Sequence, residues 1–361
     1  MEQPPVRSTP PDRQACSVSR SAVKTPHPIP YQGSKRNLAP VILGYFPESV
    51  AALIEPFAGS AAITLAAAAR GLAAHYVIND LNRPLIELWQ AIIDSPERLA
   101  RQYEMIWKAQ HEDRRHYYDK IRDMFNHTGR PDCFLYLLAR CVKAAVRYNA
   151  NGEFNQSPDN RRTGARPATM REHIFGASCL LRGKTECSSL DYREVVAKAT
   201  PDDFIYMDPP YQGVCGNRDP RYLKSVVFDE FVEVLESLNC LDIKYLVSYD
   251  GRTGDRTHGR KLPNHLRLHL VELEAGRSSQ ATLLGRAEVT VESLYLSPAL
   301  AEYSIGVRSL ESGFNWLAGG RRSESRRLRL RRIRAPAGRE GTTREGKPCS
   351  RCVVEIWNPE M

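Results

Sequence analysis

Three short apolar runs, each ending in an acidic residue, constrain the fold of this chain most strongly. They are AALIE (51–55), HYVIND (75–80) and FIYMD (204–208), and each has the length of a buried strand. An Ala-rich stretch that ends at Gly71 follows the first run, and residues 83–93 follow the second with a helical period. Strands that alternate with helices are typical of a parallel sheet covered on both faces. The chain is therefore predicted to be an α/β protein with a Rossmann-like, doubly wound sheet.

The segment between the second and third runs interrupts this alternation. Residues 96–126 and 133–147 have helical patterns and lead into the polar loop RYNANGEFNQSPDNRRTGARPATM. Residues 95–185 are therefore predicted to form an inserted, mostly helical subdomain. The sheet domain is then expected to comprise residues 29–94 and 186–300.

The alternation resumes after the third run. Residues 229–239 have a helical period, and residues 244–249 form a further predicted strand. Residues 266–273 and 289–296 alternate between apolar and polar side chains, which predicts a pair of antiparallel strands. This pair would extend the sheet at one side.

The two ends of the chain differ from the predicted folded part. Residues 1–28 are rich in Pro, Ser and Arg, and residues 301–361 are basic, so both segments are predicted to be disordered. The formal net charge is +9, but residues 321–351 alone hold twelve Arg and Lys against three Glu. The remaining chain is close to neutral, so a nucleic-acid partner of the folded part must be argued from specific residues.

Composition also restricts the setting in which the chain works. No run of about 18 apolar residues is present, so no membrane span is expected. The N-terminal residues lack an apolar signal-peptide core, which predicts an intracellular, cytoplasmic protein. The nine cysteines are scattered and odd in number, as in a reducing compartment. A single CxxC, Cys349 with Cys352, is weak evidence for zinc, and no metal site is predicted.

The acids at the ends of the three runs predict a ligand site. Carboxyl ends of neighbouring parallel strands meet at one edge of a sheet, so Glu55, Asp80 and Asp208 are expected there together. One acid at an exposed strand end would be unremarkable, whereas three favour a site. The turn EPFAGSAA lacks the G-x-G-x-x-G and G-x-x-x-x-G-K-S/T patterns, which argues against a dinucleotide or triphosphate. An acid after the second strand suits a ribose diol, so a ribose ligand with little phosphate is expected, and S-adenosyl-L-methionine fits.

The DPPY segment at 208–211 adds a chemical prediction. Its two prolines fix φ at about −65° and remove two backbone donors, and the residue before each proline is held extended. The Asp208 carboxylate and the Pro209 carbonyl are predicted to point at one spot, where they would match the two hydrogens of an exocyclic amine. Tyr211 offers a ring on which a base can stack. This arrangement favours methylation of an amino nitrogen.

Five segments in order resemble the Dam-like, D12 class of DNA adenine-N6 methyltransferases, over residues 29–298. Their order, with the recognition insert before the catalytic motif, also matches that family. The segments are YQGSK (31–35), EPFAGSAA (55–62), NDLN (79–82), RYNANGEFNQ (147–156) and DPPY (208–211).

The resemblance implies site residues. Asp208, Pro209, Pro210 and Tyr211 would be catalytic, and Lys35 would lie near the carboxylate of the cofactor. Asp191, with Tyr192, is similar to an element that contacts the cofactor adenine, although Asp191 is also a candidate helix N-cap. The implied contacts to S-adenosyl-L-methionine are Tyr31, Lys35, Glu55, Phe57, Ala58, Gly59, Asp80, Asp191 and Asp208.

The same resemblance implies a DNA-binding stretch. Its residues are Arg147, Asn149, Gly152 and Asn155, and Arg161 and Arg162 are candidate phosphate contacts or simply surface arginines.

The chain also departs from the family pattern in three places. Tyr31 stands where Trp is expected, and the recognition loop continues N-Q-S-P, so the target sequence does not transfer. The segment AGRSSQATLLGR (275–286) is unlike the family and could be a second DNA-facing loop, with Arg277 and Arg286 as candidates.

The expected function is methylation of adenine N6 in double-stranded DNA, either beside a cognate restriction endonuclease or as an orphan methylase. Cytosine-N4 methylation remains an alternative, although it goes more often with Ser-Pro-Pro-Tyr. RNA or protein-glutamine methylation goes with Asn-Pro-Pro-Tyr. A catalytically inactive DNA-binding relative is disfavoured because Lys35, Asp80, Asp208 and Tyr211 are all present. An RNA binder that works through its basic tail is the remaining alternative.

Overall fold

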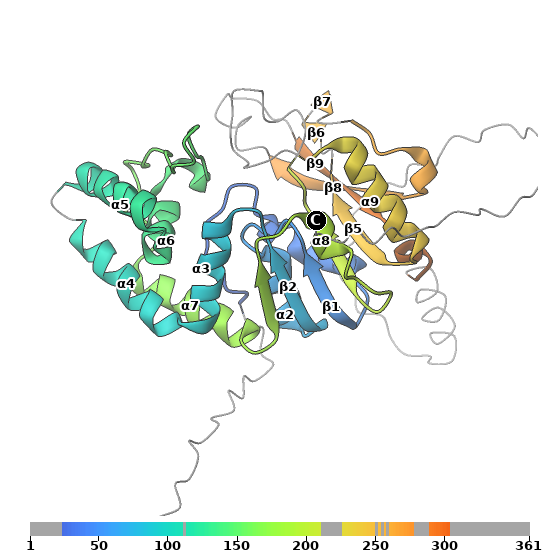
Figure 1. Cartoon of the computed structure of the whole chain (residues 1–361), viewed down its shortest axis with the longest axis horizontal. Helices are drawn as coiled ribbons and strands as arrows, with labels where there is room; N and C mark the ends of the chain where they lie inside the picture. Colours follow the sequence, from blue (N-terminus) through green and yellow to red (C-terminus); the bar gives the residue numbers. More distant parts are fainter. Residues whose placement is uncertain are drawn as a thin grey trace, which may run out of the picture. The chain divides into compact units, whose positions relative to one another are not determined.

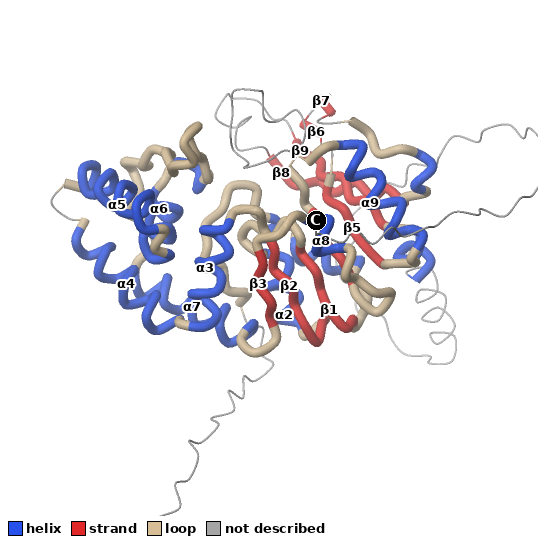
Figure 2. Tube along the Cα trace, viewed as in Figure 1, coloured by secondary structure: helices blue, strands red, loops and turns tan. Residues whose placement is uncertain are grey.

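A twisted sheet with helices on both faces organises the described residues (Figures 1 and 2). The computed structural model describes residues 24–110, 113–210, 226–249, 252–253, 256–257, 260–277 and 289–303, which belong to one compact unit of the chain. The strands are β1 (Val50–Glu55), β2 (Ala73–Asn79), β3 (Thr185–Ser188), β4 (Phe204–Met207), β5 (Lys244–Ser248), β6 (Arg252–Thr253), β7 (Arg256–Thr257), β8 (His269–Arg277) and β9 (Val289–Leu296).

The sheet is mixed, with a parallel part and an antiparallel part. Strands β3, β2, β1, β4 and β5 lie side by side in this order and are parallel. Strand β9 is antiparallel to β5, and β8 is antiparallel to β9. The short β6 also pairs with β9, and β7 pairs with β6. The predicted doubly wound α/β class is confirmed, as is the antiparallel pair near the C-terminal side.

Helices fill the connections between the strands. Helices α4, α5 and α6 gather beyond the β3 edge, on the left of Figure 1, where α7 returns to the sheet. The α-helices are α1 (Ala39–Ile42), α2 (Ala62–Arg70), α3 (Arg83–Asp94), α4 (Pro96–Ala109), α5 (Arg114–Thr128), α6 (Pro131–Arg140), α7 (Pro167–Leu181), α8 (Tyr192–Val196) and α9 (Phe228–Cys240). The 3-10 turns are η1 (Lys35–Asn37), η2 (Leu43–Tyr45), η3 (Val142–Ala144) and η4 (Asn264–Leu266). No helix of the described residues has both the length and the apolar character that a bilayer crossing requires.

Strand alternation explains why both faces are covered. In β4, Phe204 and Tyr206 join the cluster beneath α2, α3 and α7, whereas Ile205 and Met207 join the cluster beneath α8 and α9. All four side chains are buried, because successive residues of a strand point to opposite faces. The apolar run FIYM therefore requires helices on both sides.

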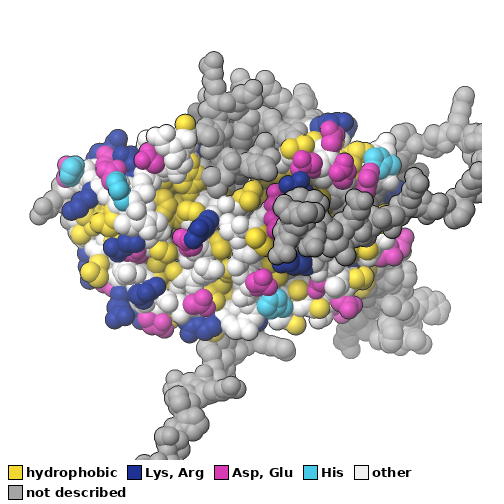
Figure 3. Space-filling model, in the orientation of Figure 1, with side chains coloured by type: hydrophobic (Ala, Val, Ile, Leu, Met, Phe, Trp, Pro, Cys, Tyr) yellow, Lys and Arg dark blue, Asp and Glu magenta, His cyan; other side chains and the backbone are white. Residues whose placement is uncertain are grey.

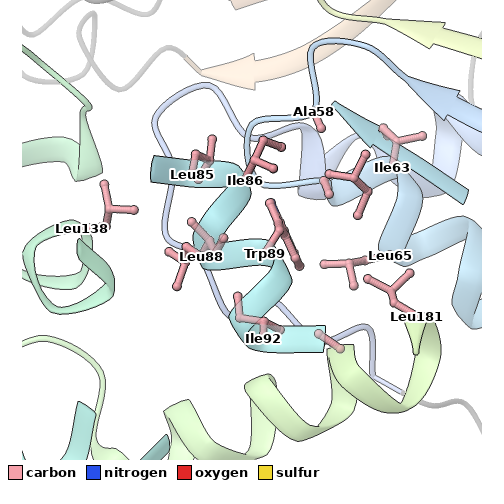
Figure 4. Close-up of a cluster of buried hydrophobic side chains, with 14 of the residues drawn as sticks. Ala58, Ile63, Leu65, Leu85, Ile86, Leu88, Trp89, Ile92, Leu138 and Leu181 are labelled. Carbon is pink, nitrogen blue, oxygen red and sulfur yellow. The ribbon is translucent and has the colours of Figure 1, made fainter. Parts of the chain in front are cut away.

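The turn after β1 is held by a buried tryptophan. Trp89 of α3 is fully buried, and its Nε1 donates a hydrogen bond to the Gly59 carbonyl at 3.0 Å. Figure 4 shows its ring packed among Ile63 and Leu65 of α2 and other apolar side chains of this core. This hydrogen bond and the packing of the ring fix the turn to the hydrophobic core.

The helices of the insert differ from the prediction at two places. The pattern predicted one helix over 96–126, but the structure has α4 and α5, and the N-cap Asp113 begins the second by accepting from two backbone amides. The pattern also predicted a helix over 133–147, but α6 ends at Arg140. Cys141 is extended, and Lys143 and Ala144 have positive φ. Apolar residues continue past the helix end because they pack in an irregular buried segment.

Three further segments differ from the sequence-based expectation. Residues 301–303 belong to the segment predicted to be disordered, but they continue a helical stretch that begins at residue 298, and residues 1–23 and 304–361 lie outside the described residues. Strand β3 pairs with β2 at the sheet edge, and its sequence TECS has no apolar alternation. Residues 24–28 were predicted to be disordered, but Pro26 and Pro28 are buried, and the His27 amide donates to His173 Nδ1 of α7 at 3.2 Å. Prolines restrict the backbone, so this segment packs with little loss of conformational freedom.

Candidate active site

A cavity opens where the parallel strands end at their carboxyl termini. It encloses about 1270 Å³, its open mouth included, and Glu55, Asp80 and Asp208 all line it. The prediction that these three carboxyl groups meet at one edge is confirmed. The other lining residues come from segments 31–35, 56–62 and 81–82, from Val146 and Tyr148, from 191–192, from 209–210, and from 226–230.

Glu55 is turned toward the start of α2. Its Oε2 accepts hydrogen bonds from the Thr64 amide at 3.1 Å and the Thr64 hydroxyl at 2.5 Å. Burial raises the pKa of Glu55 to about 8, and the nearby Asp208 and Asp80 add to this rise. At neutral pH the group is therefore mostly protonated. Its hydrogen bonds to Thr64 connect the end of β1 to the start of α2.

The turn itself approaches a tyrosine ring closely. Gly59 has φ +50°, and a Cβ placed on it would lie 3.0 Å from the ring of Tyr31. The Gly59 amide donates to Asp80 Oδ2 at 3.0 Å, and Asp80 Oδ1 accepts from the Asn82 amide at 2.9 Å. Burial raises the pKa of Asp80. Only glycine fits this position without a steric conflict, and Asp80 ties the ends of β1 and β2 together.

Buried Asn79 connects the turn to the next crossover. Its Nδ2 donates to the carbonyls of Pro56 and Leu190, both at 3.0 Å. Its Oδ1 accepts from the Leu190 amide and the Ser188 hydroxyl. One amide side chain thus aligns the carboxyl ends of β1, β2 and β3.

The aromatic residues Phe57 and Tyr192 form one wall of the cavity. Their ring centroids are 5.1 Å apart, and Tyr192 is buried. The neighbouring Asp191 is the N-cap of α8, accepting from the Arg193 amide, and it also pairs with the Arg193 guanidinium at 2.8 Å. The helix-cap interpretation of Asp191 is therefore confirmed, and the residue also lines the cavity.

Lys35 lies beside the acid of the DPPY segment. Its Nζ is 3.0 Å from Asp208 Oδ1 and 3.6 Å from Glu292 Oε2, and only 8% of the Lys35 side chain is exposed. The resemblance placed Lys35 near a cofactor carboxylate; the structure places it against Asp208. Glu292, on β9, was not found from the sequence. The sequence feature that could have indicated it is an acidic residue within a predicted strand that is mostly apolar.

The rest of the DPPY segment is described in part. Asp208 follows β4 directly, and its side chain is 20% exposed, so the carboxylate faces the cavity. Pro209 and Pro210 also line the cavity. Tyr211 lies outside the described residues.

The predicted DNA-binding stretch forms a small hairpin, closed by a bridge between Tyr148 and Phe154. Asn149 Oδ1 accepts from the Asn151 and Glu153 amides, and Gly152 has φ +77°. The Asn149 side chain therefore shapes the turn rather than projecting freely. Arg147 is half-buried and Asn155 is exposed.

This hairpin is attached at two sides. The Tyr148 hydroxyl donates to Asn82 Oδ1 at 2.9 Å, which connects the hairpin to the segment that holds Asp80. Asn126 of α5 donates to the Phe154 carbonyl at 3.1 Å and accepts from its amide at 2.9 Å. The hairpin therefore bridges the insert and the cavity.

The remaining basic candidates lie elsewhere. Arg161 and Arg162 are exposed and lie 3.5 and 3.4 Å from Asp159. Arg277 is the last residue of β8, and Arg286 lies outside the described residues.

The chain is similar to known DNA methyltransferases. The family model described as D12 class N6 adenine-specific DNA methyltransferase matches residues 31–278, which is more than half of the chain. The type II methyltransferase M1.LlaDCHI of Lactococcus lactis subsp. cremoris is 30% identical over 190 residues, covering 50% of this chain and 64% of the relative.

Two further relatives are also named as adenine methyltransferases. The DNA N-6-adenine-methyltransferase of Escherichia phage P1 is 29% identical over 190 residues, covering 50% of this chain and 23% of the relative. The DNA adenine methylase of Vibrio cholerae is 28% identical over 187 residues, covering 51% and 64%. The chain thus spans less than two thirds of the length of these curated relatives.

Proposed function

Because the chain belongs to the D12 class of N6 adenine-specific DNA methyltransferases, we propose that it methylates adenine N6 in double-stranded DNA, with S-adenosyl-L-methionine as methyl donor. The observation that carries this proposal is the position of Asp208. It follows a buried strand, precedes two prolines, and opens into the same cavity as Asp80 and the Gly59 turn.

The residues around the cavity fit the proposed cofactor. The Gly59 turn is shaped against Tyr31, and Phe57 with Tyr192 offers an aromatic wall near Asp191. Asp80 already accepts two backbone hydrogen bonds, but a carboxylate has about four lone-pair sites, so the others can accept from ribose hydroxyls. When bound, the cofactor would supply an activated methyl group.

Asp208 and the Pro209 carbonyl would hold the substrate amine. Each would accept a hydrogen bond from one N–H of the adenine N6 amine. This arrangement would aim the nitrogen lone pair into the cavity. The Lys35 ammonium lies 3.0 Å from Asp208 Oδ1 and would help to hold this carboxylate in position. The target base must leave the duplex, which costs a few kcal/mol, and stacking on Tyr211 would offset part of this cost. Most of the rate enhancement would come from positioning.

The hairpin that carries Arg147, Asn149, Gly152 and Asn155 would contact the DNA. On the face that Figure 3 shows, Lys and Arg side chains lie among Asp and Glu. On α5, Arg115 and Arg122 pair with Asp119. This surface favours recognition by specific residues over a broad basic patch. The protein would act inside the cell on DNA, either with a cognate restriction endonuclease or as an orphan methylase.

The test is identification of the methylated nucleoside. The purified chain is incubated with labelled S-adenosyl-L-methionine and unmethylated genomic DNA, which is then digested to nucleosides. Label in N6-methyladenine is the expected result, and sequencing of the same DNA would give the target site. Label in N4-methylcytosine would replace adenine by cytosine in the proposal. Absence of label together with absence of cofactor binding would overturn it.

A further inference from the structure

Lys35 lies between two carboxylates that come from distant parts of the chain. Asp208 follows β4 and Glu292 belongs to β9, and their nearest oxygens are 3.0 and 3.6 Å from Lys35 Nζ. Lys35 itself begins η1 and is 8% exposed. Asp208 and Lys35 line the cavity, whereas Glu292 is not among the described residues that do so. Among the described contacts, the ion pair with Lys35 connects Glu292 to a residue that lines the cavity.

The sheet fixes the position of Glu292. It stands opposite the buried Leu273 in the β8–β9 pair, so both side chains project from the same face. The Ser248 hydroxyl of β5 donates to Glu292 Oε2 at 3.4 Å. The side chain is 17% exposed and is held by two strands rather than by a loop.

The charge of Glu292 has a consequence for Asp208. During methylation, positive charge develops on the amine nitrogen, and a nearby carboxylate stabilises this charge while a nearby ammonium opposes it. In a partly buried site, charges interact more strongly than in water. A second carboxylate offsets Lys35, so that Asp208 remains an effective acceptor for the amine.

We propose that Glu292 is a positioning residue for methyl transfer, which holds the Lys35 ammonium against Asp208 and offsets its positive charge. This inference rests on the proposed function. It assigns a role in the reaction to the antiparallel strand β9, whose described side chains do not line the cavity.

Glu292→Gln removes the charge and keeps the shape. We expect kcat to fall roughly tenfold, the scale of one charge-assisted hydrogen bond, while KM for S-adenosyl-L-methionine stays within about twofold. Glu292→Asp keeps the charge and should recover kcat to within about threefold of wild type. The matched control is Glu272→Gln on β8, whose exposed side chain projects from the opposite face of the pair, and its kcat should stay within about twofold.

A double-mutant cycle tests whether Glu292 acts through Lys35. In the Lys35→Met background, Glu292→Gln should change kcat by less than about twofold, because its partner is absent. An equal tenfold loss in both backgrounds would overturn the inference.

A second readout needs no cofactor and no turnover. The ammonium signal of Lys35 in a ¹H–¹⁵N spectrum can be assigned by its loss in Lys35→Met. We expect Glu292→Gln to shift or broaden this signal and Glu272→Gln to leave it in place. An unchanged signal would contradict the contact, even if Glu292→Gln lowers activity by unfolding.

The two proposals fail in different ways. If wild-type protein forms no methylated base, the proposed function fails, and the role of Glu292 fails with it. If wild-type protein methylates adenine and Glu292→Gln has the same kcat, only the present inference is overturned.

Discussion

Single residues around the cavity are held in place before any ligand binds. Asp80 accepts two backbone amides, and Asn79 makes four hydrogen bonds to neighbouring segments. Side chains that are already oriented lose little entropy on binding, and this is how a site gains rate through positioning. Small substitutions at these residues should therefore lower ligand binding and reaction rate markedly.

Gly59→Ala tests the close approach of the turn to Tyr31. The positive φ and the 3.0 Å contact should together destabilise the fold by about 1–2 kcal/mol and weaken cofactor binding. Chemical denaturation and a cofactor titration measure the two effects. Gly44→Ala is the control, since a Cβ there meets nothing within 4 Å. Equal behaviour of the two variants would refute the steric account.

Glu55→Gln tests the buried carboxyl group. The pKa of Glu55 is raised from its ordinary value of 4.5 to about 8, mainly by burial. Between these values the unfolded chain releases a proton that the folded protein keeps, so this group makes the free energy of unfolding fall as pH rises. Glu55→Gln should reduce that fall between pH 5 and 8, measured by denaturant titration at each pH. An unchanged pH dependence in the variant would show that Glu55 is ionised in the fold.

At this scale the sequence predicts the residues that end strands but not the side chains that they contact. Glu55, Asp80 and Asp208 were predictable because each follows an apolar run, and parallel strands bring their ends together. Glu292 and Tyr148 were not, because their roles depend on side chains 257 and 66 positions away in the chain. Such contacts follow from the packing of distant segments, which has no local signal.

At the scale of elements, the hairpin of residues 147–155 is held by hydrogen bonds from a few side chains. Asn149 satisfies two backbone amides in the turn and donates to Glu153 Oε2 at 2.8 Å. Asn126 fixes the same hairpin to α5. Recognition of DNA would therefore use a preformed element.

Asn149→Ala should disorder this turn. We expect faster hydrogen exchange at the Glu153 amide and roughly tenfold weaker DNA binding, because two backbone amides lose their acceptor. Cofactor affinity should remain unchanged. Asn151→Ala serves as control because Asn151 contributes its backbone amide to the turn and its side chain is exposed. Protection of Glu153 that survives in Asn149→Ala would argue against this account of the turn.

Elements were predictable where the pattern was strong. Strands β1, β2, β4 and β5 and helices α2, α3 and α9 match their predicted segments within a few residues, because apolar spacing decides both type and face. Strand β3 was missed because an edge strand of four residues needs little apolar surface. The end of α6 was misplaced because burial, not helicity, explains the apolar residues after Arg140.

At the scale of the whole molecule, the sheet brings the parts of the site together. The cavity combines the segment before β1, the carboxyl ends of three parallel strands, and the hairpin of the insert. The α/β class followed from alternation along the chain. The contacts among these parts did not, because they depend on the order of strands in the sheet, β3-β2-β1-β4-β5-β9.

The basic tail allows a separate prediction from charge alone. Deletion of residues 311–361 removes twelve of the 51 Arg and Lys residues. Each lost phosphate contact should lower the salt dependence of DNA binding, with a slope change of about 0.9 per contact. Affinity measured between 50 and 200 mM salt, roughly the range over which such effects are large, tests this. Site-specific methylation should persist in the deletion variant, and its loss would assign the tail a direct part in the reaction.

The role of Asp208 is the central claim, and single-turnover methylation of adenine is the measurement that tests it most directly. Wild-type protein is compared with Asp208→Ala and with Asp202→Ala, whose exposed side chain lies near the opposite end of β4. Thermal melting shows that each variant is folded. We predict that Asp208→Ala lowers the rate of N6-methyladenine formation by about 10²–10³-fold, while Asp202→Ala stays close to wild type. A folded Asp208→Ala protein that methylates adenine at the wild-type rate would contradict the account.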